Sequence, residues 1–115
     1  MDVTTENFQR HVIERSHELP VVVDFWAAWC GPCRMLGPVI EAEVTKREGK
    51  IELAKIDVDA EQTLAAEYGI QSIPTVAVFR DGKPVTGFVG AHPAAVIGRL
   101  LDETIELHGH AAQAA

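Results

Sequence analysis

The sequence has few cysteines, few basic residues and no long apolar run, and each shortage excludes a class of protein. Its 115 residues carry a formal charge of -7, with 10 Lys and Arg scattered against 17 Asp and Glu. Nucleic acids and anionic membranes attract clustered basic residues, so neither is an expected partner. The chain begins without a basic and then apolar leader, and Asp24 interrupts its longest apolar run. These features predict a cytoplasmic protein that does not enter a membrane.

The length and composition predict one domain. Apolar residues make up 47% of the chain, which is enough for a single core without stabilising cross-links. We expect this domain to span residues 1–109 and the Ala-rich tail, residues 110–115, to fray. Nothing in the sequence indicates an obligate dimer, so a monomer is expected.

The two cysteines stand two residues apart in the segment WCGPC, residues 29–33. Such a pair can form a structural disulfide, exchange electrons with another disulfide or supply half of a metal site. A structural cross-link over so short a loop gains only roughly 2 kcal/mol. Zinc needs about four ligands, and the remaining candidates are scattered histidines, namely His11, His17, His92, His108 and His110. A redox-active pair without a metal or other bound cofactor is therefore favoured.

Hydrophobic patterning predicts an alternation of helices and strands. The apolar run at residues 21–27, interrupted by Asp24, is typical of a parallel strand that is covered on both faces, and residues 51–58 are expected to form a second central strand. Asp81-Gly82 supplies a tight turn between strands at residues 75–79 and 85–89. Helices are expected over residues 5–16, 32–48, 61–68 and 93–109. This order indicates an α/β domain with a mixed sheet.

Three residues bear on the expected helix ends. Thr5 can cap the first helix, and Pro32 suits the first turn of the second because its missing N–H is harmless there. Pro38 lies inside the second helix, where a proline costs about 3 kcal/mol. We therefore expect this helix to be kinked and divided into two parts.

The chain resembles the thioredoxin family along essentially its whole length. The features shared in order and spacing are VVVDFWAA before WCGPC, then Lys55, Ile73-Pro74-Thr75, Asp81-Gly82 and Val89-Gly90-Ala91. The resemblance implies the thioredoxin fold, a central mixed sheet of four to five strands with helices on both faces. The family's first strand is shortened here to about residues 2–4.

The positions of the cysteines predict different roles. A free thiol with a pKa near ~8.5 is only about 3% ionised at pH 7. Cys30 precedes a helix, whose unpaired amides and dipole would lower its pKa by about one. Cys33, one turn into the helix, should be less exposed and should resolve the mixed disulfide by intramolecular attack.

Asp24 and Lys55 are the candidate acid and base groups behind the cysteines. Asp24 lies in a strand without a polar face, so desolvation should raise its pKa. That suits a proton acceptor for Cys33, and the resemblance implies this role, acting through water. A buried aspartate with only a structural place is the alternative. Lys55, in the neighbouring strand, either holds its ammonium near Asp24 or is solvated.

The resemblance also implies a substrate-binding surface. It implies a cis bond between Ile73 and Pro74, which would place the Ile73 backbone beside Cys30, where it can pair with an extended substrate. An apolar rim would surround it, formed by Trp29, Gly31, Pro32, Ile73, Gly90 and Ala91. Core packing is the alternative for Trp29. Trp26 and Pro38 are expected to support the site structurally.

The resulting hypothesis is a general protein-disulfide reductase that acts on varied disulfide-containing proteins. The resemblance implies that thioredoxin reductase regenerates it with electrons from NADPH. Two alternatives stay open: a thiol oxidase or isomerase, whose redox poise would differ, and a binding module or holdase that does not use its thiols. Gly31-Pro32 and the missing leader favour the reductant.

Overall fold

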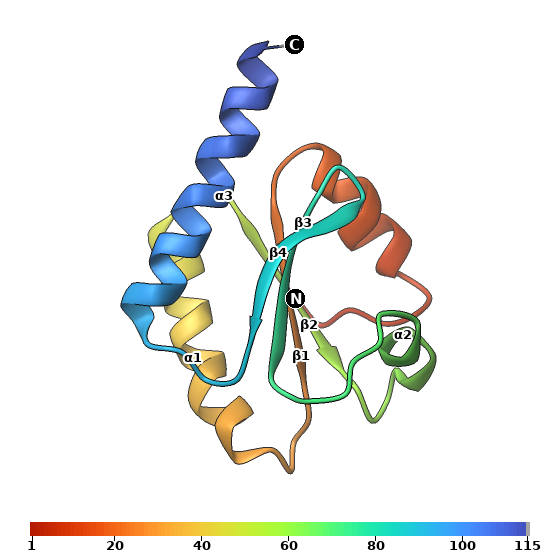
Figure 1. Cartoon of the computed structure of the whole chain (residues 1–115). Coiled ribbons are helices and arrows are strands. Elements are labelled where there is room, and N and C mark those ends of the chain that lie inside the picture. Colours follow the sequence, from red (N-terminus) through yellow and green to blue (C-terminus); the bar gives the residue numbers. More distant parts are fainter. Residues whose placement is uncertain (115) are drawn as a thin grey trace.

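A four-stranded mixed sheet in the order β2-β1-β3-β4 forms the centre of the computed structural model (Figure 1). The structure describes the backbone of residues 1–114 and the side chains of residues 1–106. The strands are β1 (Val21–Trp26), β2 (Glu52–Asp57), β3 (Thr75–Arg80) and β4 (Lys83–Val89). β1 pairs with β2 in parallel, whereas β3 is antiparallel to both β1 and β4. The predicted mixed sheet, with a crossover followed by a hairpin, is confirmed.

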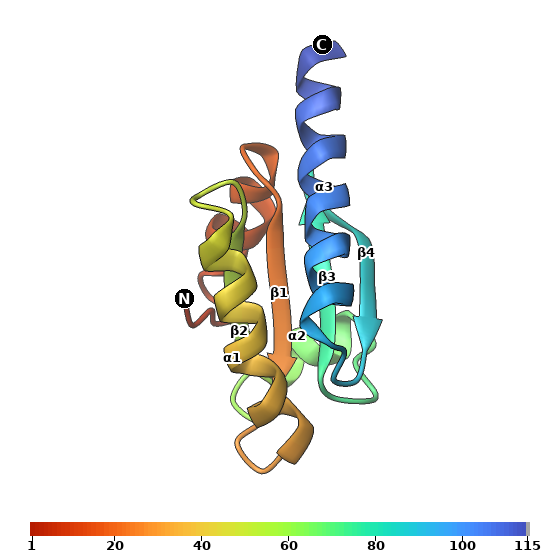
Figure 2. The ribbon, with the colours of Figure 1, turned by 90° about the vertical axis from the view of Figure 1, so that its left-hand side faces the viewer.

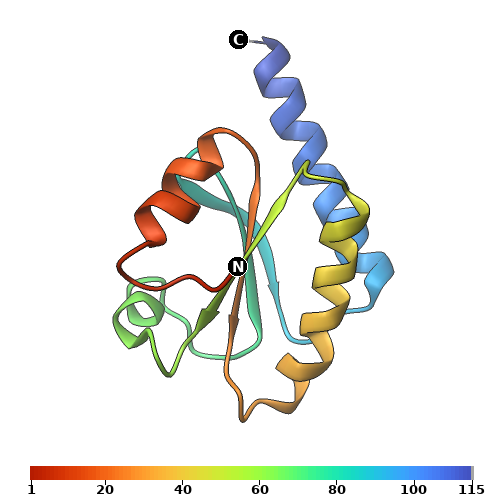
Figure 3. The same ribbon diagram turned by 180° about the vertical axis from the view of Figure 1, so that it is seen from behind.

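Helical segments cover both faces of this sheet. α1 (Gly31–Lys46) and α3 (Ala94–Ala114) lie on one face, as Figure 2 shows from the side. On the other face lie α2 (Gln62–Glu67) and an N-terminal segment made of wide π turns, η1 (Gln9–Glu14), and a 3-10 turn, η2 (Arg15–His17) (Figure 3). No helix of the described residues is long and apolar enough to span a membrane.

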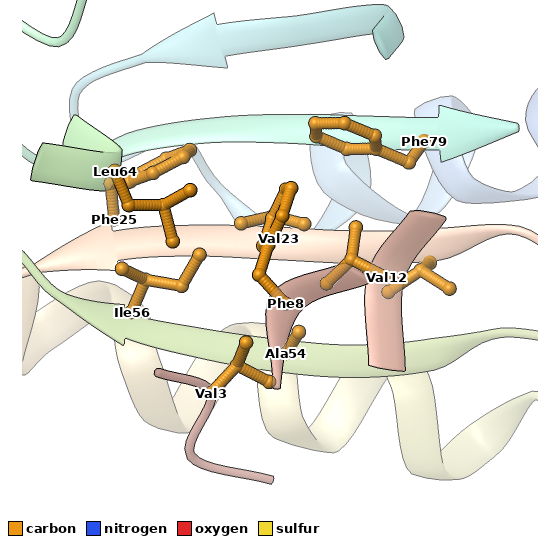
Figure 4. Close-up of a cluster of buried hydrophobic side chains, with 10 residues drawn as sticks. Val3, Phe8, Val12, Val23, Phe25, Ala54, Ile56, Leu64 and Phe79 are labelled. Carbon is orange, nitrogen blue, oxygen red and sulfur yellow. The ribbon is translucent and has the colours of Figure 1, made fainter. Parts of the chain in front are cut away.

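The period of two along each strand divides the core into two clusters. Val21, Val23 and Phe25 of β1 point to the side of α2 and η1, where they join the apolar cluster of Figure 4. Val22 points the other way and packs with residues of α1 and α3. Asp24 and Trp26 share the face of Val22, so the polar interruption in β1 lies under α1.

The N-terminus departs from the expected helix start. The first strand is reduced to one bridge, Asp2 with Lys55, with the Val3 N–H donating to the Lys55 carbonyl oxygen at 2.8 Å. Thr5 does not cap the helix, because its N–H and hydroxyl both donate to Glu61. The hydroxyl of Thr4 instead accepts from the N–H of Asn7 at 3.3 Å. The first helical element, η1, begins at Gln9, later than the expected start at residue 5.

The ends of the other helices follow from the backbone. α1 stops two residues before its expected end because Glu48 and Gly49 have positive φ values of 45° and 82°. It is one continuous element across the exposed Pro38, so its division into two parts was wrong, whereas the kink stays a prediction. α3 continues past Gly109 to Ala114, since alanines sustain a helix there. Ala115 of the expected tail lies outside the described residues.

The hairpin turn is formed as predicted. Asp81 and Gly82 have φ values of 53° and 86°, the left-handed conformation that this tight turn requires. β4 begins at Lys83, two residues earlier than expected, and the register shifts between Val78 and Phe79. The hairpin carries the chain back towards the end of the sheet where β1 leads into α1.

Candidate functional site

The two cysteines lie where β1 passes through a short loop into α1. Cys30 is the N-cap residue of α1, and Pro32 occupies its first turn. The Cys33 N–H donates to the Cys30 Sγ at 3.2 Å, which satisfies one of the amides left unpaired at a helix start. The two residues form a disulfide with their Cα atoms 5.3 Å apart. The local sequence therefore places one sulfur at the end of the helix and the other one turn inside it.

The burial of the two cysteines differs from the prediction. Each is 4% exposed in this oxidised state, so Cys33 is not the more hidden of the two. Both pack in a small cluster with Ala27, against which Trp26 and Ile73 also lie. Position in the helix therefore distinguishes the cysteines here, because the disulfide holds both sulfurs in the same cluster.

A cis peptide bond between Ile73 and Pro74 shapes the segment opposite the disulfide, as the resemblance implied. The Ile73 carbonyl oxygen lies 3.8 Å from the Cys30 Sγ. The Gly90 N–H donates to the Pro74 carbonyl oxygen at 2.8 Å, and Gly90 has a φ of 91° that favours glycine. Three segments that are distant in the sequence therefore meet at the cysteines.

The candidate rim is mostly accessible. Trp29 is 69% exposed, so it is not a core residue. Its indole Nε1–H donates to the Asp59 carboxylate at 2.8 Å, a contact that sequence reasoning missed. Pro32 and Ala91 are also exposed, whereas Gly31, Ile73 and Gly90 are half-buried. Trp26 is half-buried, and its Nε1 has no hydrogen-bond partner among the described residues.

Asp24 is the buried carboxyl that the sequence predicted. It is 1% exposed, and its Oδ1 has no hydrogen-bond partner among the described residues. Burial raises the pKa of Asp24 to about 6, the positive charge of Lys55 lowers it, and the negative charge of Glu41 raises it further. The carboxyl therefore changes its protonation state close to neutral pH.

The sequence left open whether the Lys55 ammonium lies near Asp24 or in solvent, and the structure places it between these two positions. It lies opposite Asp24 in the parallel register of β1 and β2. Its Nζ is 3.2 Å from the Glu41 Oε1 and 5.2 Å from the centre of the Trp26 ring. The ammonium is therefore paired on its outer side rather than simply solvated.

Sequence reasoning missed Glu41, and the sequence shows only on which face of the helix it lies. Glu41 follows Gly37 by four residues, so both lie on one face of α1. A Cβ at Gly37 would be 3.6 Å from the Lys55 Nζ, which shows that this face of α1 covers Lys55. The sequence alone does not show that the lysine reaches across to it.

The described residues do not bring metal ligands together. Among the side chains of residues 1–106, no group of three or more His, Cys, Asp or Glu has an arrangement that fits a metal ion. The side chains of His108 and His110 lie outside the described residues. The groups that the site does assemble are two sulfurs, a helix N-terminus and a buried carboxyl, which suit thiol–disulfide exchange.

Comparisons with known proteins agree with this chemistry. The family model for thioredoxin matches residues 1–103. The chain is 46% identical over 103 residues to a thioredoxin of Porphyra purpurea, covering 90% of this chain and 94% of that protein. It is 47% identical over 104 residues to thioredoxin 2 of Chlorobaculum tepidum, with the same coverage. The fold, the disulfide site and these matches together show that the chain belongs to the thioredoxin family.

Proposed function

We propose that this thiol–disulfide oxidoreductase is a general protein-disulfide reductase in which Cys30 attacks and Cys33 resolves. The Cys30 thiolate bonds to one sulfur of a target disulfide, and the other target sulfur leaves as a thiolate. The Cys33 thiolate then attacks the Cys30 Sγ and releases the second target sulfur. Two electrons pass to the target, and the Cys30–Cys33 disulfide seen in the structure is the product. The observation that carries this proposal is that disulfide at a helix N-terminus beside the Ile73 backbone.

The helix start supports Cys30 as the attacking thiol. The Cys33 N–H that donates to the Cys30 Sγ at 3.2 Å would stabilise a thiolate more than a thiol. The positive end of the α1 dipole acts in the same direction. Cys33 lies inside the helix and lacks this end-on position. The favoured nucleophile is therefore the N-cap sulfur.

Asp24 is the proposed proton acceptor for Cys33. Burial raises its pKa to about 6, so at neutral pH the carboxylate is largely ionised and able to take a proton. Its Oδ1 makes no hydrogen bond among the described residues and is free to accept one from a bridging water. The proton lost by Cys33 would pass to this oxygen when the mixed disulfide is resolved.

The surface around the disulfide supports recognition of extended substrates. Ile73 offers its backbone next to Cys30, and the exposed Trp29 and Ala91 flank the site. An extended segment can pair with that backbone as a short strand, which requires no particular side chains. Such binding suits varied target proteins. The small or compact residues Gly31, Pro32 and Gly90 would let the substrate backbone come close to the Ile73 backbone.

Turnover requires that the disulfide is reduced again. We assign this step to thioredoxin reductase, which takes its electrons from NADPH, with no cofactor bound to this chain. The protein would work as a monomer in the cytoplasm, where reducing equivalents of this kind keep thiols reduced.

Insulin reduction tests the activity. With thioredoxin reductase and NADPH, the wild-type protein should consume NADPH and precipitate reduced insulin, while the Cys30→Ser variant should do neither. Absence of turnover by the wild type, beside an active control thioredoxin, would reject the proposal. A double Cys30→Ser, Cys33→Ser variant that retained the protein's cellular activity would favour a holdase instead.

Trapping experiments test the assignment of the two cysteines. The Cys33→Ser variant should accumulate mixed disulfides through Cys30, because the resolving thiol is missing. If mixed disulfides formed instead in Cys30→Ser and needed Cys33, the roles would be reversed. Equilibration with glutathione separates a reductase from an oxidase, since a potential change of 30 mV corresponds to about 1.4 kcal/mol.

A further inference from the structure

Three charged side chains form a line from the interior to the surface on the α1 side of the sheet. Asp24 of β1 is buried, Lys55 of β2 is 23% exposed, and Glu41 of α1 is 53% exposed. Lys55 lies opposite Asp24 in the register, but the ion pair that its Nζ makes, at 3.2 Å, is with Glu41. The Asp24 Oδ1 is left without a partner among the described residues.

We propose that Glu41 is a positioning residue that draws the Lys55 ammonium outward and so keeps Asp24 in a form that readily binds a proton. This inference rests on the proposed role of Asp24 as proton acceptor. The single positive charge of Lys55 is attracted by both Glu41 and Asp24. Without the charge of Glu41, the Lys55 ammonium would interact more strongly with Asp24. Glu41 therefore acts through Lys55 and needs no contact with the cysteines.

The surroundings of Asp24 leave few other groups that could tune it. From β3 its register partner is the apolar Val76. The buried residues that α1 and α3 contribute to this face are also apolar: Leu36, Ile40, Ile97 and Leu101. Lys55 and Glu41 are the two charges that act on its pKa, and in the reduced protein the Cys33 thiol is the further titratable group. Burial has the largest effect on this carboxyl, and the charges that act on it besides burial are those of this one ion pair.

Trp26 contacts the Lys55 side chain, which lies between the carboxyl groups of Asp24 and Glu41. The Lys55 Nζ lies over the Trp26 ring, 5.2 Å from its centre, which favours a cation at that place. Trp26 follows Asp24 by two residues on the same face of β1. The Lys55 ammonium is thus held by the Trp26 ring and the Glu41 carboxylate rather than by Asp24.

The test is the pKa of Asp24, followed by carboxyl carbon NMR in the oxidised protein. In Glu41→Gln, a neutral substitution of the same shape, the freed Lys55 moves towards Asp24 and the negative charge of Glu41 is gone. Both changes favour the ionised form, so the pKa of Asp24 should fall by about half a unit or more. The control is Glu6→Gln, which removes the same charge from an exposed residue before η1 and should leave the Asp24 titration unchanged.

A second background shows whether Glu41 acts through the lysine. In Lys55→Gln the same Glu41→Gln change should lower the pKa of Asp24 clearly less than it does in the wild type. An Asp24 titration unchanged by Glu41→Gln, or equally shifted in both backgrounds, would overturn the inference. Because the titration needs no turnover, these results are independent of insulin reduction, whose failure in the wild type would reject the proposed function alone.

Discussion

The two faces of β1 show how one strand serves two purposes. On the side of α2, Val23 and Phe25 join a cluster whose buried residues are all apolar, and in it the Phe79 ring lies 5.5 Å from the ring of Tyr68 and 5.8 Å from that of Phe8. On the side of α1, Asp24 and Trp26 leave two buried polar atoms without partners among the described residues. Both faces contribute apolar packing, but the buried carboxyl and the chemistry lie on the α1 side alone.

The difference has a physical basis. Burying aromatic and aliphatic side chains stabilises the fold by about 25 cal/mol for each Å² of apolar surface. A buried polar group without a partner costs about 1 to 3 kcal/mol. The free energy gained by packing the apolar face of β1 therefore offsets the cost of burying the Asp24 carboxyl on the other face. Truncating a side chain of the aromatic cluster should therefore destabilise the protein, whereas removing the charge of Asp24 should stabilise it.

The largest effect is expected on the apolar face. Phe79→Ala removes a fully buried ring from the aromatic cluster and should lower the free energy of unfolding by about 4 kcal/mol. Urea unfolding measures this loss, and insulin reduction per folded molecule should stay near the wild-type value. Val85→Ala, at an exposed position of β4, is the control with little expected effect. A comparable loss in both variants would contradict the contribution of the buried aromatic cluster to stability.

Asp24→Asn should have the opposite sign and depend on pH. Burial raises the Asp24 pKa from 3.8 to about 6 in the folded protein, so the unfolded chain releases its proton first as the pH rises. The wild type therefore loses stability between these two values, by up to about 3 kcal/mol, and the loss persists at higher pH. The variant should be more stable than the wild type at pH 8, equally stable below pH ~4, and slower in insulin reduction.

Urea unfolding of wild type and Asp24→Asn across this pH range decides the matter. A stability difference that stayed constant from acid to alkaline conditions would show that the carboxyl does not change its proton affinity on folding. In that case burial of the Asp24 carboxyl would have no electrostatic cost, and the two faces of β1 would differ only in how their side chains pack.

The smallest effect concerns a second group of charges on the α1 side. Arg47, the C-cap residue of α1, donates to Asp102 of α3 at 2.8 Å and to the Gly98 carbonyl oxygen at 3.0 Å, and it pairs with the buried Glu43. A Cβ at Gly98 would lie 2.9 Å from the Glu43 Oε1, so Gly98→Ala forces this network to move. The higher helix propensity of alanine offsets part of this cost, and we expect a net loss of up to about 1 kcal/mol in thermal or urea unfolding.

Gly37→Ala is the matched control for that change. Its Cβ would make an ordinary contact at 3.6 Å, so the higher helix propensity of alanine should dominate and stabilise the protein by about 0.5 to 1 kcal/mol. If both variants gained stability, the charge network between α1 and α3 would not constrain the packing of these helices.

The fold was largely predictable because its signals are local. Residues 21–27 form a continuous apolar run with one aspartate, which predicted both a covered strand and a buried carboxyl. Asp81-Gly82 predicted the hairpin, since few other residue pairs adopt two successive positive φ angles. The shortened first strand was also evident from residues 2–4.

The contacts that tune the site were not predictable in the same way. The pairs Glu41 with Lys55 and Trp29 with Asp59 join segments that lie far apart in the sequence. Their formation depends on side-chain direction after the elements have packed, which hydrophobic periodicity does not encode. The equal burial of Cys30 and Cys33 was missed for a related reason: helix position alone does not show what a disulfide does to the exposure of both sulfurs.

The single bridge between Asp2 and Lys55 has a consequence for association between molecules. It leaves much of the outer side of β2 without a regular neighbouring strand in the part of the chain that the structure describes. An exposed edge strand can pair with an edge strand of another molecule, and charged side chains on it disfavour that pairing. Glu52, Lys55 and Asp57 place charges at intervals along β2, a pattern that disfavours the addition of another strand.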